Sequence, residues 1–134
     1  MKRLLTGVFA LCIAVFFSAP LFGSEPLEDF PRLTNEKFTE TIKNKKKYVL
    51  VDVRTPEEFK AGHIPGAINI NVKDSVEFAS KTAKLDKKKT IALYCRGGVR
   101  SKVAAQKLLA DNYKVVDLVK GFDAWDGATT KEAD

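Results

Sequence analysis

Two short and almost uninterrupted apolar runs constrain the fold most strongly. Residues 48–53 read Tyr-Val-Leu-Val-Asp-Val, and residues 90–94 read Thr-Ile-Ala-Leu-Tyr. A strand with one face in water alternates apolar and polar side chains, whereas a continuous run is typical of a strand covered on both faces. Helical patterns separate these runs from two weaker strand patterns at residues 63–70 and 114–119. The alternation predicts a small α/β domain with a mainly parallel sheet.

Capping residues place the helices between these strands. Thr34 precedes the first helix, and Thr55-Pro-Glu-Glu58 forms a capping box with proline at the first helical position. Gly62 closes this second helix, and Ser101 is in a position to cap the last one. The predicted helices cover residues 35–43, 56–61, 74–81 and 101–111.

The N-terminus has the order of a secretory signal. Lys2 and Arg3 precede 19 uncharged residues at 4–22, and the small residues Gly23 and Ser24 follow. We expect cleavage between Gly23 and Ser24, which would make the protein periplasmic or secreted. The alternative is an uncleaved membrane anchor, because the apolar run nearly reaches the ~20 residues that span a bilayer.

The rest of the chain divides into three parts. A segment with two prolines and no periodicity leads into the domain, and a polar stretch ends the chain. The predicted organisation is a signal peptide at 1–23, an N-terminal arm at 24–32, a domain at 33–127 and a C-terminal tail at 128–134.

The count of cysteine and histidine limits the chemistry. Two cysteines and one histidine cannot build a Cys/His zinc site or a disulfide scaffold, so a metal ion would have to rest on carboxylates. We expect neither a metal ion nor a cofactor. Cleavage after Gly23 would remove Cys12 and leave Cys95 as the only thiol. Cys95 is then either a buried inert thiol or a reactive one.

The basic surplus of the chain is modest. The formal charge is +6, and removal of residues 1–23 leaves 21 basic and 17 acidic residues, a net charge of +4. The lysine runs at 45–47 and 87–89 lack interleaved aromatic residues, which favours solvated turns. We therefore expect no nucleic-acid partner, and no membrane contact after cleavage.

The segment after the third strand carries the strongest chemical signal. It reads Cys95-Arg-Gly-Gly-Val-Arg-Ser101 and lies at the carboxyl end of a strand, where ligands collect in open α/β sheets. Adjacent glycines allow backbone N–H groups to converge on an anion, and a helix N-terminus adds donors. Nearby arginines favour the thiolate form of a cysteine. The segment predicts a nucleophilic Cys95 and an anion-binding loop formed by Arg96, Gly97, Gly98, Val99, Arg100 and Ser101. The alternative is a structural cysteine followed by a glycine turn.

Four motifs in succession resemble a known family. They are Val51-Asp-Val-Arg-Thr-Pro-Glu-Glu-Phe59, Gly62-His-Ile-Pro-Gly-Ala-Ile-Asn-Ile70, Cys95-Arg-Gly-Gly-Val-Arg-Ser101 and Lys120-Gly-Phe-Asp-Ala-Trp125. In this order they are similar to the signatures of a single-domain rhodanese, a thiosulfate sulfurtransferase-like protein. The resemblance implies a five-stranded parallel sheet flanked by helices. It also implies that Cys95 carries a sulfane sulfur as a persulfide.

The resemblance also implies a reaction. An exported sulfurtransferase of this type would move sulfur from thiosulfate, a polysulfide or a persulfide to a thiol or cyanide, and a partner protein could deliver or accept it. The alternative is a non-catalytic persulfide carrier or docking module. Related phosphatases and arsenate reductases place the closing arginine six residues after the cysteine. Here Arg100 lies five after Cys95, which favours a terminal sulfur over a phosphate-sized oxyanion.

Other polar residues in these motifs have structural interpretations. His63 is the only histidine and could act as a base, but it lies in a turn signature that the family uses for packing. Asp52, Arg54 and Glu58 predict a charged cluster that fixes the capped helix at a strand end, with the pocket rim as the alternative place for Asp52 or Arg54.

The last motif departs from the family pattern at one position. Lys120-Gly121 stands where many relatives have Gly-Gly, close to Phe122 and Trp125. We expect these two aromatic side chains to lie in the core or the pocket wall.

Overall fold

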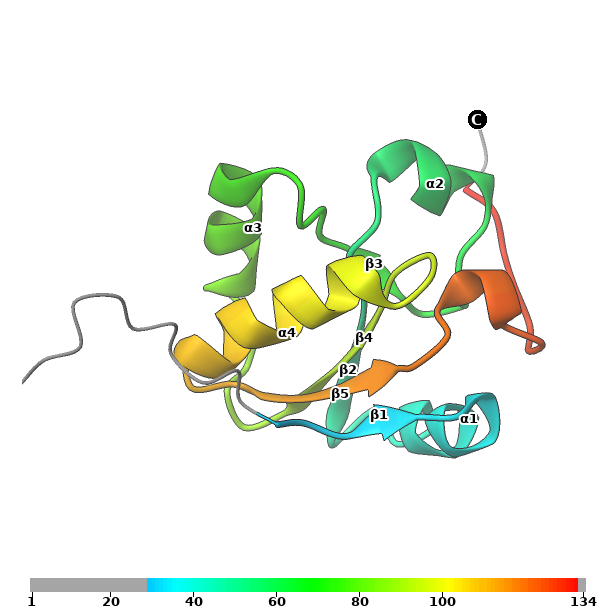
Figure 1. Ribbon diagram of the computed structural model, residues 1–134, viewed down its shortest axis with the longest axis horizontal. Coiled ribbons are helices and arrows are strands. Elements are labelled where there is room, and N and C mark those ends of the chain that lie inside the picture. The colour runs from blue at the N-terminus through cyan, green and yellow to red at the C-terminus, as the bar shows by residue number, and fades with distance from the viewer. Residues whose placement is uncertain (1–28, 133–134) are drawn as a thin grey trace, which may run out of the picture.

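The computed structural model describes residues 29–132, which form one parallel five-stranded sheet with helices on both faces (Figure 1). The strand order is β1-β5-β4-β2-β3, and every neighbouring pair is parallel. The predicted fold class is confirmed. The strands are β1 (Arg32–Leu33), β2 (Tyr48–Asp52), β3 (Ile68–Asn69), β4 (Thr90–Tyr94) and β5 (Lys114–Leu118).

The helices lie close to their predicted places and divide between the two faces of the sheet. α3 and α4 cover one face, and α1 covers the other (Figure 1). The helices are α1 (Asn35–Ile42), α2 (Pro56–Ala61), α3 (Ser75–Thr82) and α4 (Val99–Ala110), and a short 3-10 helix spans Phe122–Ala124.

The predicted helix caps are present at α1 and α2. Thr34 accepts a hydrogen bond from the backbone N–H of Lys37. At α2 the capping box is complete, because Thr55 Oγ1 accepts from the N–H of Glu58 and the Glu58 carboxylate accepts from the N–H of Thr55. Each cap satisfies N–H groups that the first turn leaves without a partner. Local sequence therefore sets where these helices begin.

Two local predictions were wrong. Arg32 was assigned to the end of the arm, but together with Leu33 it forms β1, the edge strand that pairs with β5 through Arg32↔Asp117 and Leu33↔Leu118. Ser101 does not cap α4, because the helix begins two residues earlier, at Val99. Gly98 is the N-cap residue in a left-handed conformation that only glycine adopts readily. Ser101 is instead fully buried inside the helix.

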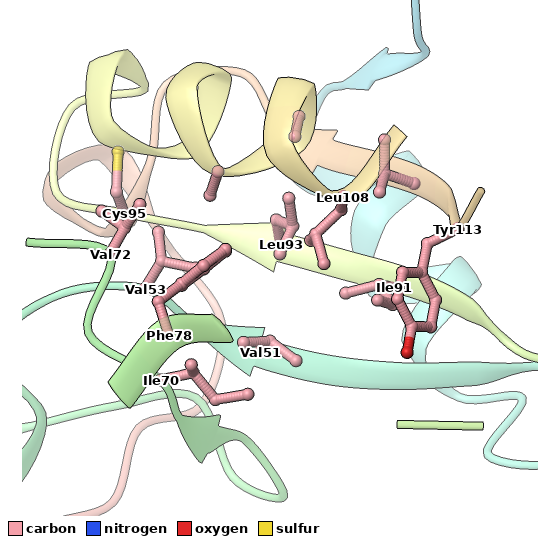
Figure 2. Close-up of a cluster of buried hydrophobic side chains, with 13 residues drawn as sticks. Val51, Val53, Ile70, Val72, Phe78, Ile91, Leu93, Cys95, Leu108 and Tyr113 are labelled. Carbon is pink, nitrogen blue, oxygen red and sulfur yellow. The ribbon is translucent and has the colours of Figure 1, made fainter. Parts of the chain in front are cut away.

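Alternate residues of β4, together with Cys95 directly after it, pack into two clusters of buried side chains on opposite faces of the sheet. Ile91, Leu93 and Cys95 pack in the cluster beneath α3 and α4, while Ala92 and Tyr94 pack in the cluster against α1. Figure 2 shows Cys95 at one end of the first cluster, with its sulfur pointing toward the first turn of α4. The alternation of the strand therefore decides which helix the thiol meets.

The described residues begin at 29, before β1, and end at 132, after the 3-10 helix. The predicted signal peptide, residues 1–23, lies outside the described residues, and so does Cys12. Within residues 29–132, no helix is long and apolar enough to cross a bilayer. Near the C-terminus, Thr130 forms an isolated antiparallel bridge with His63.

Candidate active site

Cys95 follows β4 directly and is almost completely buried, with 1% of its surface exposed. The backbone N–H of Gly98 donates a hydrogen bond to Sγ at 3.0 Å, and Sγ lies 3.4 Å from the hydroxyl oxygen of Ser101. An N–H donor aimed at the sulfur favours the thiolate. The structure thus brings Cys95, Gly98 and Ser101 of the predicted loop together, while Arg96, Gly97 and Val99 lie at its exposed rim.

Gly98 has a backbone conformation that the site requires. Its φ is 94°, and a Cβ at this position would lie 2.4 Å from the carbonyl oxygen of Val119. A side chain would therefore collide with the backbone that follows β5. Gly97 shows no such restriction, because a Cβ there would meet nothing within 4 Å. Of the two adjacent glycines, the second one is needed to aim an N–H at the sulfur.

The turn after β5 holds the start of the loop from the other side. The N–H groups of Phe122 and Asp123 donate to the carbonyl oxygens of Cys95 and Arg96 at 2.8 and 3.0 Å. Gly121 has a φ of 67°, and a Cβ there would lie 2.4 Å from the carbonyl oxygen of Arg96. Lys120 is exposed. The departure from Gly-Gly therefore falls on the position that tolerates a side chain.

Arg100 is held by Glu58, which the sequence analysis assigned only to the capped helix. The two guanidinium nitrogens donate to the two carboxylate oxygens at 2.7 and 2.9 Å. These hydrogen bonds lower the pKa of Glu58 to about 2 and raise the pKa of Arg100, to which the charge of Cys95 also contributes. Glu58 is thus a site residue that the sequence analysis missed. The signal that could have identified it is its place in a capping box directly after β2, at the edge of the sheet where the loop of Cys95 also lies.

The side chain of Arg96 is exposed at the surface of the loop. Its side chain is 67% exposed and pairs with Asp123, which is 59% exposed, at 3.1 Å. Exposed ion pairs of this kind contribute little, because water screens both charges. The two arginines of the loop therefore have different surroundings.

Asp52 and Arg54 form a buried structural pair, in agreement with one of the two predicted places. Arg54 donates to Asp52 at 2.6 Å and to the carbonyl oxygen of Gly62 at 2.7 Å. Its guanidinium carbon also lies 4.2 Å from the centre of the Phe122 ring. Burial lowers the pKa of Arg54, but the hydrogen bond and charge of Asp52 outweigh it, so the pKa is raised. The pair ties α2 to the aromatic turn after β5.

His63 is occupied with packing. Its ring stacks on Phe59 at 3.7 Å between centroids, and Nδ1 lies 2.8 Å from the carbonyl oxygen of Phe59. The carbonyl can only accept, so Nδ1 carries the proton in this contact. The residue is buried. These contacts account for His63 without a role as base.

The described residues offer no obvious metal site. Within residues 29–132, no group of three or more His, Cys, Asp or Glu side chains is arranged to hold a metal ion.

Comparison with known proteins identifies the family. A family model described as the rhodanese-like domain matches residues 34–128, which include the whole loop. The chain belongs to the rhodanese-like domain family. A putative sulfurtransferase of Bacillus subtilis, YtwF, is 33% identical over 101 residues, which cover 75% of this chain and 95% of that protein.

Two further relatives show how widely the rhodanese-like domain is used. The adenylyltransferase and sulfurtransferase UBA4 of Candida albicans is 34% identical over 107 residues, or 75% of this chain, but the match spans only 24% of that longer protein. A crystal structure of a rhodanese-like domain protein from Staphylococcus aureus superimposes with a TM-score of 0.68 at 27% identity, covering 78% of this chain and all of that one.

A separate cavity of about 440 Å³ lies on the α1 side of the rhodanese-like domain. Ile42, Tyr48, Ile64 and Trp125 line it, together with three lysines, Lys43, Lys45 and Lys89. Cys95 and the residues of its loop are not among the lining residues. The cavity is therefore distinct from the thiol site.

Proposed function

We propose that this protein is an exported sulfurtransferase that carries a sulfane sulfur on Cys95. The observation that supports it most directly is the Gly98 N–H aimed at the sulfur of Cys95 at 3.0 Å, inside a loop whose arginine is held by Glu58. A thiolate stabilised in this way is a nucleophile at neutral pH. Membership of the rhodanese-like family and the similarity to sulfurtransferases support the same reaction class.

The first half-reaction loads the sulfur. The Cys95 thiolate attacks the outer sulfur of thiosulfate, a new S–S bond forms, and the bond to the sulfonate sulfur breaks, so that sulfite leaves with the electron pair. Cys95 then holds a persulfide. Backbone N–H groups at the start of α4 and the cation of Arg100 stabilise the negative charge on the donor and on the terminal sulfur. A polysulfide would load the site in the same way, with the polysulfide anion shortened by one sulfur as leaving group, and a persulfide would do so with a thiolate as leaving group.

The second half-reaction empties the site. A thiolate or cyanide attacks the terminal sulfur, the S–S bond to Cys95 breaks, and the Cys95 thiolate is regenerated. Donor and acceptor therefore react in turn, which is ping-pong kinetics. The acceptor can be a thiol of a partner protein, which would reach the buried Cys95 across the exposed residues Arg96, Gly97 and Val99.

The nearest competing activity is hydrolysis of a phosphate ester. Arg100 lies five residues after Cys95 and is paired with Glu58, and only 1% of Cys95 is exposed. A small donor that presents a terminal sulfur fits this loop better than a bulky oxyanion. Assay with an aryl phosphate is therefore expected to show no turnover above the Cys95→Ser background.

Export is the second part of the proposal. It is supported by Lys2, Arg3, the apolar run at 4–22 and the small residues Gly23 and Ser24. Fractionation and N-terminal sequencing of the expressed protein should give a soluble product outside the cytoplasm that begins at Ser24. A full-length product retained in the membrane would contradict cleavage and indicate an anchored protein.

Substitution of the thiol tests the sulfurtransferase directly. Cys95→Ser should lower thiosulfate:cyanide turnover by at least about 10³-fold, because an alcohol is a far poorer nucleophile at neutral pH and holds no persulfide. The circular dichroism spectrum should stay unchanged. A folded variant with appreciable turnover would exclude Cys95 as the carrier. Wild-type protein that loads sulfur once but does not turn over would favour the carrier role.

A further inference from the structure

Arg32 reaches the back of the loop from the edge strand β1. Its Nε donates to the Asp117 carboxylate at 2.8 Å, and its Nη2 lies 2.7 Å from the same oxygen. Nη2 also donates to the carbonyl oxygens of Gly98 at 2.8 Å and Val119 at 3.3 Å. One guanidinium thus joins β5 to the residue that contacts the Cys95 sulfur. Arg32 precedes residues 34–128, the part of the chain that the family model matches.

The contact with Arg32 restrains Gly98, whose N–H must keep a fixed direction to donate to the Cys95 sulfur. The same residue donates its N–H to Cys95 Sγ and offers its carbonyl oxygen to Arg32. Glycine is the most flexible residue, so an unheld Gly98 would sample many directions of its N–H. A Cβ on Gly98 would lie only 2.9 Å from Arg32 Nη2, which shows how closely the guanidinium packs on this backbone.

Asp117 fixes the guanidinium in turn. Its side chain is fully buried, whereas the Arg32 side chain is 28% exposed. Burial raises the pKa of Asp117, and neighbouring Ser101 and Arg32 oppose that rise. A buried carboxylate is costly without a cation, so Asp117 binds Arg32 tightly. A planar fork can contact the carboxylate and the Gly98 carbonyl at once, which a single ammonium group does less well.

We propose that Arg32 is a positioning residue for Cys95: it holds the carbonyl of Gly98 and so restrains the φ and ψ angles that set where the adjacent Gly98 N–H points. This rests on the proposed function only in taking Cys95 as the nucleophile. The charged groups around the loop are Arg32 from β1, Asp117 from β5, Arg100 from α4 and Glu58 from α2. Arg96 and Asp123 lie at its rim, Asp52 also acts on Arg100, and Lys102 acts on Asp117. Loss of Arg32 removes the restraint on Gly98 and also leaves Asp117 without its cation, and both changes disfavour the thiolate.

The test is the rate at which iodoacetamide alkylates Cys95, measured as a function of pH. Arg32→Ala should slow alkylation about 10-fold at pH 7, and the two proteins should converge at alkaline pH. Lys114→Ala is the control, because it removes an exposed cation from the first residue of β5, the strand that carries Asp117, away from the loop. It should leave the profile in place.

A double variant separates the two effects of Arg32. In Arg32→Ala/Asp117→Asn no carboxylate is left unpaired, so the slowed alkylation should persist if the restraint on Gly98 matters. Return of the wild-type profile in this variant would mean that only the charge of Asp117 acts, and would overturn the proposal. An unchanged rate at pH 7 in Arg32→Ala, or a loss of equal size at every pH, would also overturn it.

Arg32→Lys serves if the alanine variant does not fold. It keeps a cation beside Asp117 but not the fork, so we expect a smaller loss of rate at pH 7, and a profile identical to wild type would overturn the proposal. The readout uses no sulfur donor. Wild-type protein that alkylates readily but takes up no sulfur would therefore contradict the proposed function while leaving the role of Arg32 standing.

Discussion

Arg100 and Arg96 belong to the same short loop and yet occupy different environments. Arg100 is fixed by two hydrogen bonds to Glu58, and its side chain is 21% exposed. Arg96 pairs with Asp123 at the surface, where its side chain is 67% exposed. A cation that is held in place beside a buried thiol acts through a lower effective dielectric than one that moves in water. The partner of an arginine, rather than its distance from Cys95 along the chain, decides what it contributes.

The contrast between the two arginines is tested most directly by removing Arg100. Arg100→Ala should lower the rate of sulfur loading by thiosulfate at neutral pH by about 10²-fold, as loss of a donor to a developing anion does elsewhere. Stopped-flow loading at neutral pH measures this rate. A loss below twofold at neutral pH would contradict the assignment of Arg100.

Removing the partner of Arg100 should have a smaller effect. Glu58→Gln keeps a side chain of the same shape and leaves the Arg100 charge in place. It removes one of the two acceptors that orient the guanidinium and leaves the other without its charge. We expect loading to fall about 3- to 10-fold. Glu57→Gln, on an exposed neighbour in α2, is the matched control. Equal rates in the two variants would show that Arg100 needs no fixed orientation.

The same pair predicts a dependence of stability on acid. The pKa of Glu58 falls from 4.5 to about 2 in the folded protein, so the unfolded chain binds more protons between these values. The stabilisation from Glu58 is therefore present above about pH 4.5 and is lost as the pH falls toward 2. Urea unfolding of wild type and Glu58→Gln should differ most above pH 4.5 and converge near pH 2. A constant difference across this range would contradict the linkage.

The smallest effect on sulfur loading is expected for the exposed pair of Arg96 and Asp123. Arg96→Ala and Asp123→Asn should each change loading less than about twofold, because water already screens this ion pair. The small difference should shrink further as the salt concentration rises. If Arg96→Ala instead lowers loading as much as Arg100→Ala, the two arginines contribute equally and the contrast between them fails.

Local signals in the sequence predicted much of the fold. The continuous runs at β2 and β4 identified buried parallel strands, because their burial on both faces leaves no alternation. The threonines before α1 and α2 identified the helix starts, because each cap is a contact between residues three apart. The fifth strand of the sheet came only from the resemblance to rhodanese. β1 has two residues, too few for any periodic pattern.

Long-range pairs could not be predicted in the same way. Glu58 and Arg100 lie 42 residues apart, and Arg32 and Asp117 lie 85 apart, so no local pattern joins them. The predicted start of α4 was wrong for a related reason. Ser101 is a good capping residue, but the N-cap is Gly98, and only the long-range contact with the backbone after β5 shows that this position has no room for a side chain.

The most direct test of the central claim is the intact mass of the purified protein before thiosulfate, after thiosulfate and after cyanide. The account predicts a gain of one sulfur atom with thiosulfate and its loss with cyanide, with fragment masses placing the sulfur on Cys95. Cys95→Ser should gain nothing. A wild-type mass that does not change with thiosulfate, or an added sulfur that remains after removal of the thiol at Cys95, would contradict a persulfide carried by this residue.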